Sequence, residues 1–338
     1  MIKLLKSELN PILMPKPEND WENLVVCNPG VWYEKGKFYM LYRAAGNDRN
    51  HVIRFGLATS TDGVRFTRVG DKPVFGPSEN GEDAGGVEDP RIIKLDDYYY
   101  VTYAFRPCPP GQYWTFRHDE VVTKDFGPNA PLFLKNNIAN SGLAITKDFH
   151  SWRRLGRLTD SDLDDRDVII FPEKVHGKFV MIHRPKEWVG ERYGTNYPGV
   201  WIRYSDDILT WKEPSKLLLK GIEGTWEEKV GGSTPPMKVD GGWLMLYHGV
   251  ENGGKGYYRV GAALLSADNP SIVLGRTKEP ILEPEYDYET KGIYNGCVFP
   301  TGSVIVDGTL YVYYGAADKC IGVATCGVDE LVDSILAE

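Results

Sequence analysis

The sequence predicts an all-β fold, a five-bladed β-propeller with a short C-terminal helix, and three observations support this prediction. Five times along the 338 residues a proline opens an apolar strand, at spacings of 61, 82, 64 and 64 residues. A polar turn and a second, aromatic-rich strand follow each time. A Ser/Thr-x-Asp turn with a downstream aromatic residue comes next in three copies, and more weakly in a fourth. A recurring unit with room for about four strands corresponds to one propeller blade.

The repeated elements can be placed one by one. A two-sheet sandwich is the alternative, but sandwiches rarely show five copies in register. The apolar residues of segment 328–336 recur at helical spacing, which predicts the helix at the end of the chain. The prolines are Pro29, Pro90, Pro172, Pro236 and Pro300; the second strands cover residues 38–43, 99–104, 179–184, 243–248 and 310–315; the outer turns are 60–62, 146–148, 205–207 and 266–268.

We expect a single domain over residues 1–338, because a closed ring of blades is one unit whose core lies between neighbouring sheets. The net charge of −8, without a basic run, argues against nucleic acid or an anionic membrane as partner. No apolar stretch is long enough for a signal peptide or a membrane span, which predicts a cytoplasmic protein. The five cysteines contain no Cys-x-x-Cys pair and the six histidines are scattered, so we expect neither disulfides nor a metal site. The oligomeric state stays open, a homo-oligomer included.

One segment interrupts the repeat. Residues 105–139 account for most of the long 82-residue spacing and are rich in proline and aromatic residues. A surplus loop of this kind is either a lid over the central pocket or an ordinary surface loop. Tyr113, Trp114 and Phe116 are suited to stacking on a sugar, and we interpret the segment as a candidate lid.

The candidate pocket is the axial channel, where repeat-equivalent residues converge. Aligning the five second strands places Arg43, Ala104, Arg184, His248 and Gly315 at one position. A single arginine there would most simply pair with a carboxylate, but three basic residues in an acidic protein indicate an anionic or polyhydroxylated ligand.

Asp89 is the candidate acid. It precedes Pro90 in an apolar strand that follows two glycines, where a carboxylate is poorly solvated. Strand alternation places Asp89 and Arg91 on one face and Glu88 on the other. The alternative is an ion pair between Asp89 and Arg91 or another arginine. Before the other prolines stand Asn28, Phe171, Pro235 and Phe299, so the first two blades alone place a polar residue there.

These motifs together resemble glycoside hydrolase family 130, over nearly the whole chain from Asn28 to Asp318. Each motif is weak alone and specific in combination. They are Gly86-Val-Glu-Asp-Pro-Arg91, Arg166-Asp-Val-Ile-Ile-Phe-Pro-Glu-Lys174, His183-Arg-Pro185, Lys229-Val-Gly-Gly232, Gly242-Trp-Leu-Met-Leu-Tyr-His-Gly-Val250 and Tyr313-Tyr-Gly-Ala-Ala-Asp318.

The resemblance implies a five-bladed propeller acting on β-mannosides, as an inverting phosphorylase that releases α-mannose 1-phosphate. Its co-substrate is inorganic phosphate and it needs no cofactor. Two further residues are substrate-binding candidates. Arg91 lies on the same strand as Asp89, and Arg184 is one of the five aligned second-strand residues. Matched residue by residue, the family pattern assigns Asp89 as proton donor, Arg166, Lys229 and His248 to phosphate, Asn28, Arg43 and Asp318 to the mannosyl unit, and Tyr257 to a place near a further pocket tyrosine.

The chemistry is consistent with these residue types. Inverting hydrolysis needs a second carboxylate to activate water, whereas phosphate is already anionic and needs cationic donors instead. Arg166 is followed by Asp167, which favours the members acting on β-1,2-linked mannosides such as mannobiose; this aspartate must turn away from phosphate or pair with Arg166. Two alternatives remain: a β-mannosidase, with Glu173, Glu227 and Glu228 as carboxylates to inspect, and a non-catalytic glycan-binding propeller.

Overall fold

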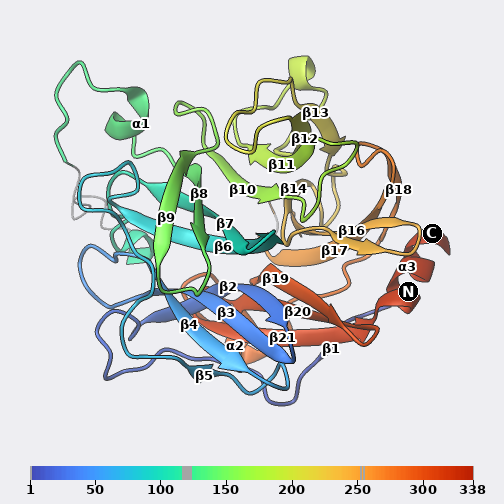
Figure 1. Cartoon of the computed structure of the whole chain (residues 1–338), viewed down its shortest axis with the longest axis horizontal. Helices are drawn as coiled ribbons and strands as arrows, with labels where there is room; N and C mark the ends of the chain where they lie inside the picture. The colour runs from blue at the N-terminus through green and yellow to red at the C-terminus, as the bar shows by residue number, and fades with distance from the viewer. Residues whose placement is uncertain (1, 116–123, 252, 254–255, 338) are drawn as a thin grey trace.

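The computed structural model describes residues 2–115, 124–251, 253 and 256–337. Within these ranges, five antiparallel sheets surround a common axis, so the fold is the predicted five-bladed β-propeller (Figure 1). Each of the first four blades is built from consecutive strands. They are β2 (Val25–Glu34), β3 (Lys37–Ala45), β4 (Arg54–Ser60) and β5 (Thr67–Arg68); β6 (Gly86–Leu95), β7 (Tyr98–Arg106), β8 (Asn140–Thr146) and β9 (Trp152–Arg157); β10 (Asp165–Ile170), β11 (Phe179–Pro185), β12 (Val200–Ser205) and β13 (Lys216–Leu219); and β14 (Lys229–Gly232), β15 (Met237–Val239), β16 (Gly242–Val250), β17 (Tyr258–Ser266) and β18 (Val273–Arg276).

The fifth blade joins the two ends of the chain. It contains β19 (Val298–Val306), β20 (Thr309–Ala316) and β21 (Cys320–Gly327), and its outermost strand is β1 (Leu5–Lys6) from the N-terminal segment. Leu5 lies opposite Thr325 and Lys6 opposite Ala324. A strand of two residues has no measurable hydrophobic period, so sequence analysis did not detect this closure of the ring.

Helices are short in the described ranges. They are α1 (Leu132–Lys135), α2 (Asp287–Thr290), α3 (Val328–Ala337) and the 3₁₀ turns η1 (Tyr113–Thr115) and η3 (Glu191–Tyr193), and none of them is long and apolar enough to cross a membrane. The predicted C-terminal helix is confirmed as α3, whose Val328, Leu331, Val332 and Ile335 are buried in the core between the fourth and fifth blades. Leu336, which we also assigned to the apolar face, is 56% exposed.

Three of the five prolines, Pro29, Pro90 and Pro300, lie inside the innermost strands rather than at their beginnings, whereas Pro172 follows β10 and Pro236 lies between β14 and β15. In the first two blades, Pro29 and Pro90 stand at a β-bulge, directly after residues with positive φ, Asn28 (42°) and Asp89 (55°). A bulge tolerates proline because the ladder hydrogen bond is already interrupted there. In the third blade the same bulge begins at Asp167 (φ 55°), five residues before Pro172. The alignment on prolines was therefore wrong for this blade, whose counterpart of Asp89 is Asp167 and not Phe171.

The second strands do align as predicted. In the first three blades, Arg43, Ala104 and Arg184 pair with the residue directly before the bulge of the innermost strand. In the last two blades, His248 and Gly315 pair with Gly231 and Phe299 of the innermost strand. The residue before each of these five is bonded to a buried carboxylate, a repeat that sequence analysis missed. This pairing anchors the second strand of every blade next to the axis. The pairs are Tyr42 with Glu22, Tyr103 with Asp83, His183 with Asp165, Tyr247 with Glu227 and Tyr314 with Glu289.

The outer turns follow the predicted chemistry in the first three blades. The Asp62 carboxylate accepts backbone N–H bonds from Val64 and Arg65, and Asp148 and Asp207 make corresponding bonds. In the fourth blade Asn269, rather than Asp268, accepts the bond, from Ser271. A side-chain acceptor two residues before the donor is the usual way in which Asp and Asn close such turns.

Candidate active site

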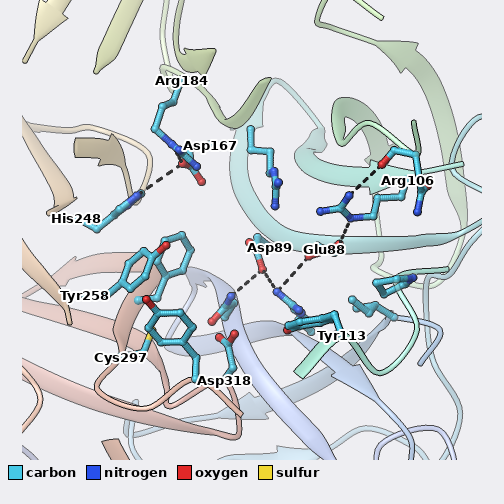
Figure 2. Close-up of a pocket in the computed structure, with 18 residues that line it drawn as sticks. Glu88, Asp89, Arg106, Tyr113, Asp167, Arg184, His248, Tyr258, Cys297 and Asp318 are labelled. Carbon is cyan, nitrogen blue, oxygen red and sulfur yellow. Dashed lines mark hydrogen bonds and ion pairs between the residues drawn. The ribbon is translucent and has the colours of Figure 1, made fainter. Parts of the chain in front are cut away.

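A cavity of about 350 Å³ opens at the axis, lined by side chains from all five blades. Seven of the ten residues that the sequence proposed line it, and Figure 2 shows how several of them converge. Three do not line it. The seven are Asn28, Arg43, Asp89, Arg166, Arg184, His248 and Asp318, and the three are Arg91, Lys229 and Tyr257.

The Asp89 carboxylate is held from one side. Asn28 Nδ2 and Arg43 Nη1 both donate to Oδ1, over 2.8 and 3.0 Å. In the described part of the chain no hydrogen bond is made to Oδ2 of this carboxylate, whose side chain is 15% exposed. Gly315 makes room for this arrangement, because a Cβ at that position would collide with Asn28 Oδ1. The anchored oxygen fixes the carboxyl group and leaves the other oxygen available to a ligand.

Glu88 also lines the cavity, which corrects the expectation from strand alternation. The bulge after Glu88 breaks the alternation and turns two successive side chains to the same side. Arg43 Nη1 lies 3.3 Å from Glu88 Oε2, and Arg106 Nε lies 3.4 Å from Oε1. Burial acts to raise the pKa of Glu88, but the charges of Arg43 and Arg106 outweigh it and lower the pKa. Glu88 is thus an ionised counter-ion of two arginines.

Asp318 is the third carboxyl group in this part of the cavity. It lies just beyond β20 with a φ of 50°, and Figure 2 shows it on the other side of Asp89 from Arg106. Burial raises the pKa of Asp318, although Arg43 opposes the shift. Asp318 therefore holds a proton more readily than an exposed aspartate does.

Three basic residues, Arg166, Arg184 and His248, also line the cavity and are together called its basic side. Arg166 makes two 2.7 Å bonds to the carboxylate of Asp164. Arg184 Nε donates to Asp167 Oδ2 over 2.6 Å, and His248 Nε2 lies 3.7 Å from the same oxygen (Figure 2). Asp167 thus pairs with Arg184, not with Arg166. Burial acts to raise the pKa of Asp167, but the positive charges of Arg184 and Arg91 hold it well below its usual range.

His248 is a neutral imidazole in this environment. Burial lowers its pKa to about 3; Asp167 opposes the shift, and the charges of Arg184 and Arg91 add to it. Its ring packs against Phe299, with ring centroids 4.7 Å apart, and Nδ1 lies 3.4 Å from Ser233 Oγ. A neutral imidazole can still donate one N–H bond to an anion. A bound dianion would draw a proton to this ring.

We expect the free energy of unfolding to fall as the pH is lowered from 6.5 toward 3. His248 titrates near 6.5 when unfolded and near 3 when folded, so in this window the unfolded chain binds the extra proton and acid favours unfolding. Urea titrations at pH 7 and pH 5 measure the effect, and His248→Gln should flatten the difference. His51, whose pKa burial lowers to about 4, keeps part of the slope.

The control for this experiment is His150→Gln, at an exposed position. It should leave the pH dependence of the urea midpoint as in the original chain. An equal slope in His248→Gln and His150→Gln would contradict the buried, neutral state of His248.

The three remaining candidates lie outside the cavity lining. Lys229 begins β14 opposite Val250, two residues before Gly231, the partner of His248. Tyr257 packs against Gly296, where a Cβ would collide with its ring, and its neighbour Tyr258 faces the cavity instead. Arg91 is 2% exposed and bonded to protein groups. The ligand-binding roles proposed for these three residues remain predictions.

Several lining residues were not proposed as site residues, although Tyr113 was named as part of the candidate lid. Glu88, Asp167 and Phe299 lie on the innermost strands β6, β10 and β19, and most of the others come from loops or strand ends outside the aligned repeat positions. Arg106 could have been proposed as a lining residue, because it follows by two residues Ala104, the aligned second-strand residue of the second blade. The full set of lining residues that were not proposed as site residues is Ile53, Glu88, Arg106, Pro110, Tyr113, Asn137, Asp167, Tyr258, Tyr294, Cys297 and Phe299.

The inserted segment contributes directly to one wall of the cavity. Tyr113 lines it while remaining 43% exposed, and Trp114 packs edge-on against His51 with ring centroids 4.6 Å apart. Asn137 holds the base of the segment through bonds with Arg106 and Cys108. Phe116, the third aromatic of the candidate lid, lies outside the described residues. The role of a lid remains a prediction.

A cavity in the central channel of a propeller, with a few convergent polar groups among aromatic side chains, is typical of a small-molecule binding or active site. The glycoside hydrolase family 130 model, described as β-1,4-mannooligosaccharide phosphorylase, matches residues 6–126 and 134–337, and the chain belongs to this family. In the described ranges, no group of three or more His, Cys, Asp or Glu side chains could hold a metal ion.

Individual relatives are similar over almost their whole length. The 1,2-β-oligomannan phosphorylase of Thermoanaerobacter sp. (strain X514) is 38% identical, covering 96% of this chain and 97% of the relative. The β-1,2-mannobiose phosphorylase of the same organism is 37% identical, with the same coverage. The solved structure of β-1,2-mannobiose phosphorylase from Listeria innocua, in complex with β-1,2-mannobiose, matches with a TM-score of 0.78 at 26% identity and covers 100% of both chains.

Proposed function

We propose that this chain is an inverting glycoside phosphorylase that cleaves a β-mannoside with inorganic phosphate and releases α-mannose 1-phosphate. The observation that carries the proposal is a shared cavity. The half-anchored carboxyl group of Asp89 and the basic side formed by Arg166, Arg184 and His248 line one space, large enough for a sugar and an anion. The family membership and the names of the relatives support the same reaction.

The reaction follows from this arrangement. Asp89 gives its proton to the glycosidic oxygen, the bond between that oxygen and the anomeric carbon breaks, and a phosphate oxygen forms the new bond on the opposite face of the ring. Attack from the opposite face converts the β configuration into the α configuration. Arg166 and Arg184 supply charged N–H donors for the phosphate. The scheme uses phosphate as co-substrate and requires no further cofactor.

A β-1,2-linked mannobiose or short mannooligosaccharide is the substrate that the comparisons favour. The two Thermoanaerobacter relatives are named for β-1,2 linkages, while the family model carries a β-1,4 description. The whole-length match to a complex with β-1,2-mannobiose points the same way.

Hydrolysis on the same scaffold is the less supported reading. The carboxylates that we named as candidate bases do not line the cavity. Glu173 pairs with Lys238 on the surface, Glu227 accepts a 2.6 Å bond from Tyr247, and Glu228 accepts a 3.4 Å bond from the backbone of Gly224. Glu88, which does line it, is held between two arginines.

Product analysis tests the proposal. The enzyme is incubated with β-1,2-mannobiose or β-1,4-mannobiose, with and without inorganic phosphate. We expect α-mannose 1-phosphate and one mannose per cleaved β-1,2-mannobiose, only when phosphate is present, and slower cleavage of the β-1,4 isomer. Release of two mannose molecules at the same rate in phosphate-free buffer would show hydrolysis instead. Binding of mannobiose with no cleavage in either buffer would indicate a pure glycan-binding propeller.

A further inference from the structure

Arg91 lies at the centre of the propeller and binds three blades at once. It belongs to β6 of the second blade and is 2% exposed. Its Nη1 donates to the backbone carbonyl of Asp89 over 3.0 Å, its Nη2 to Asp167 Oδ1 of the third blade over 3.0 Å, and its Nε to the carbonyl of Ser233 in the fourth blade over 3.1 Å. The guanidinium carbon also lies 6.0 Å from the ring centroid of Phe299 in the fifth blade.

The first of these bonds acts on the proton donor. Asp89 has a positive φ of 55°, a conformation that costs free energy in any residue with a side chain and persists only when its surroundings enforce it. The bond from Arg91 fixes the carbonyl of this residue on one side, while Asn28 and Arg43 fix its carboxylate on the other. The direction in which the acid points therefore depends on Arg91.

The second bond acts on the anion-binding side. Asp167 occupies the same bulge position as Asp89, with the same φ of 55°. Its Oδ1 accepts from Arg91, and its Oδ2 accepts from Arg184 and lies 3.7 Å from His248. A continuous chain of short bonds thus runs from the backbone of the acid through Arg91 and Asp167 to Arg184.

We propose that Arg91 is a positioning residue that sets the placement of the Asp89 acid relative to the basic side of the cavity. It does not line the cavity, so it acts through Asp89 and Asp167 rather than on the substrate. This inference rests on the proposed phosphorolysis. Proton donation and phosphate attack occur on opposite faces of one sugar ring, so the spacing between the two groups governs the rate.

Arg91→Lys tests the inference. Lysine keeps the positive charge but concentrates its N–H donors at one nitrogen, so it cannot reach three acceptors on three blades. We expect kcat with β-1,2-mannobiose to fall by about 100-fold and the KM for phosphate to rise by about 10-fold, as for a misplacement of roughly 1 Å. Calorimetric titration with inorganic phosphate measures the binding change apart from turnover, and thermal unfolding reports the folded fraction.

The matched control is Arg154→Lys. Arg154 belongs to the same blade, pairs with Asp83 over 2.7 Å and lies away from the cavity. It should lose thermal stability while keeping kcat and the KM for phosphate within about twofold of the original enzyme, as expected when a distant interaction is removed. If Arg91→Lys also keeps both constants within this range, or loses only the activity explained by its unfolded fraction, the inference is wrong.

A second variant covers a failure of Arg91→Lys to fold. Asp167→Asn leaves an amide oxygen for Arg91 but removes the charge that joins it to Arg184, and kcat should fall by about 10-fold. An unchanged kcat in a folded Asp167→Asn would overturn the inference. The unmodified enzyme distinguishes the failure of this inference from the failure of the proposed phosphorolysis. If the unmodified enzyme shows no phosphate-dependent cleavage, both proposals fail. If it is active and both Arg91→Lys and Asp167→Asn are equally active, only the role of Arg91 is refuted.

Discussion

Asp89→Asn is expected to lower kcat for phosphorolysis of β-1,2-mannobiose by about 10²- to 10⁴-fold, the usual contribution of a positioned general acid. Asparagine has the same shape and keeps an Oδ1 that can accept the bonds from Asn28 and Arg43, so the cavity should stay intact. Steady-state kinetics measure the loss. Calorimetric titration with mannobiose should show binding within a few-fold of the original enzyme.

The neighbouring carboxyl groups provide the discriminating variants. Glu88→Gln removes a counter-ion of Arg43 and Arg106, and Asp318→Asn removes a carboxyl group whose pKa burial raises. Both should lose less turnover than Asp89→Asn, because neither is expected to donate the proton. If Asp89→Asn retained activity while Asp318→Asn abolished it, Asp318 would be the acid and our assignment would be wrong.

Gly231→Ala is expected to raise the KM for phosphate by about 10-fold or more, because it displaces two of the proposed phosphate donors, His248 and Arg184. Gly231 pairs with His248 across β14 and β16. A Cβ there would stand 2.5 Å from His248 Nε2 and 2.9 Å from Arg184 Cδ, and it would also collide with His248 Cε1. The imidazole is buried against Phe299 and has little room to retreat, so overpacking should also cost about 1–3 kcal/mol of stability.

Gly70→Ala is the matched control for this substitution. A Cβ at Gly70 meets no atom within 4 Å, and its backbone does not need a positive φ. Its kinetic constants and unfolding midpoint should match those of the original enzyme. An unchanged KM for phosphate in Gly231→Ala would show that His248 and Arg184 do not form the phosphate site.

The sequence itself determined the repeat and the aligned second-strand positions that face the axis. Five aromatic strands in register predicted five blades, and Arg43, Arg184 and His248 were brought together because equivalent positions of a propeller face one axis. Asp89 and Asn28 were found from their place before a proline. The C-terminal helix followed from apolar residues at helical spacing. All of these signals are local or periodic, and a single sequence displays them directly.

Only the tertiary structure showed which charged groups pair with one another and which of them face the cavity. The bulges turned Glu88 into the cavity and made Asp167 the counterpart of Asp89, because one extra residue in a strand reverses the side that every following residue faces. Arg91, proposed as a ligand-binding residue, proved to be bonded to three blades. The closure of the ring by β1 likewise joins residues more than 300 positions apart. Partners of this kind are set by packing between distant segments, and no local pattern of residues encodes them.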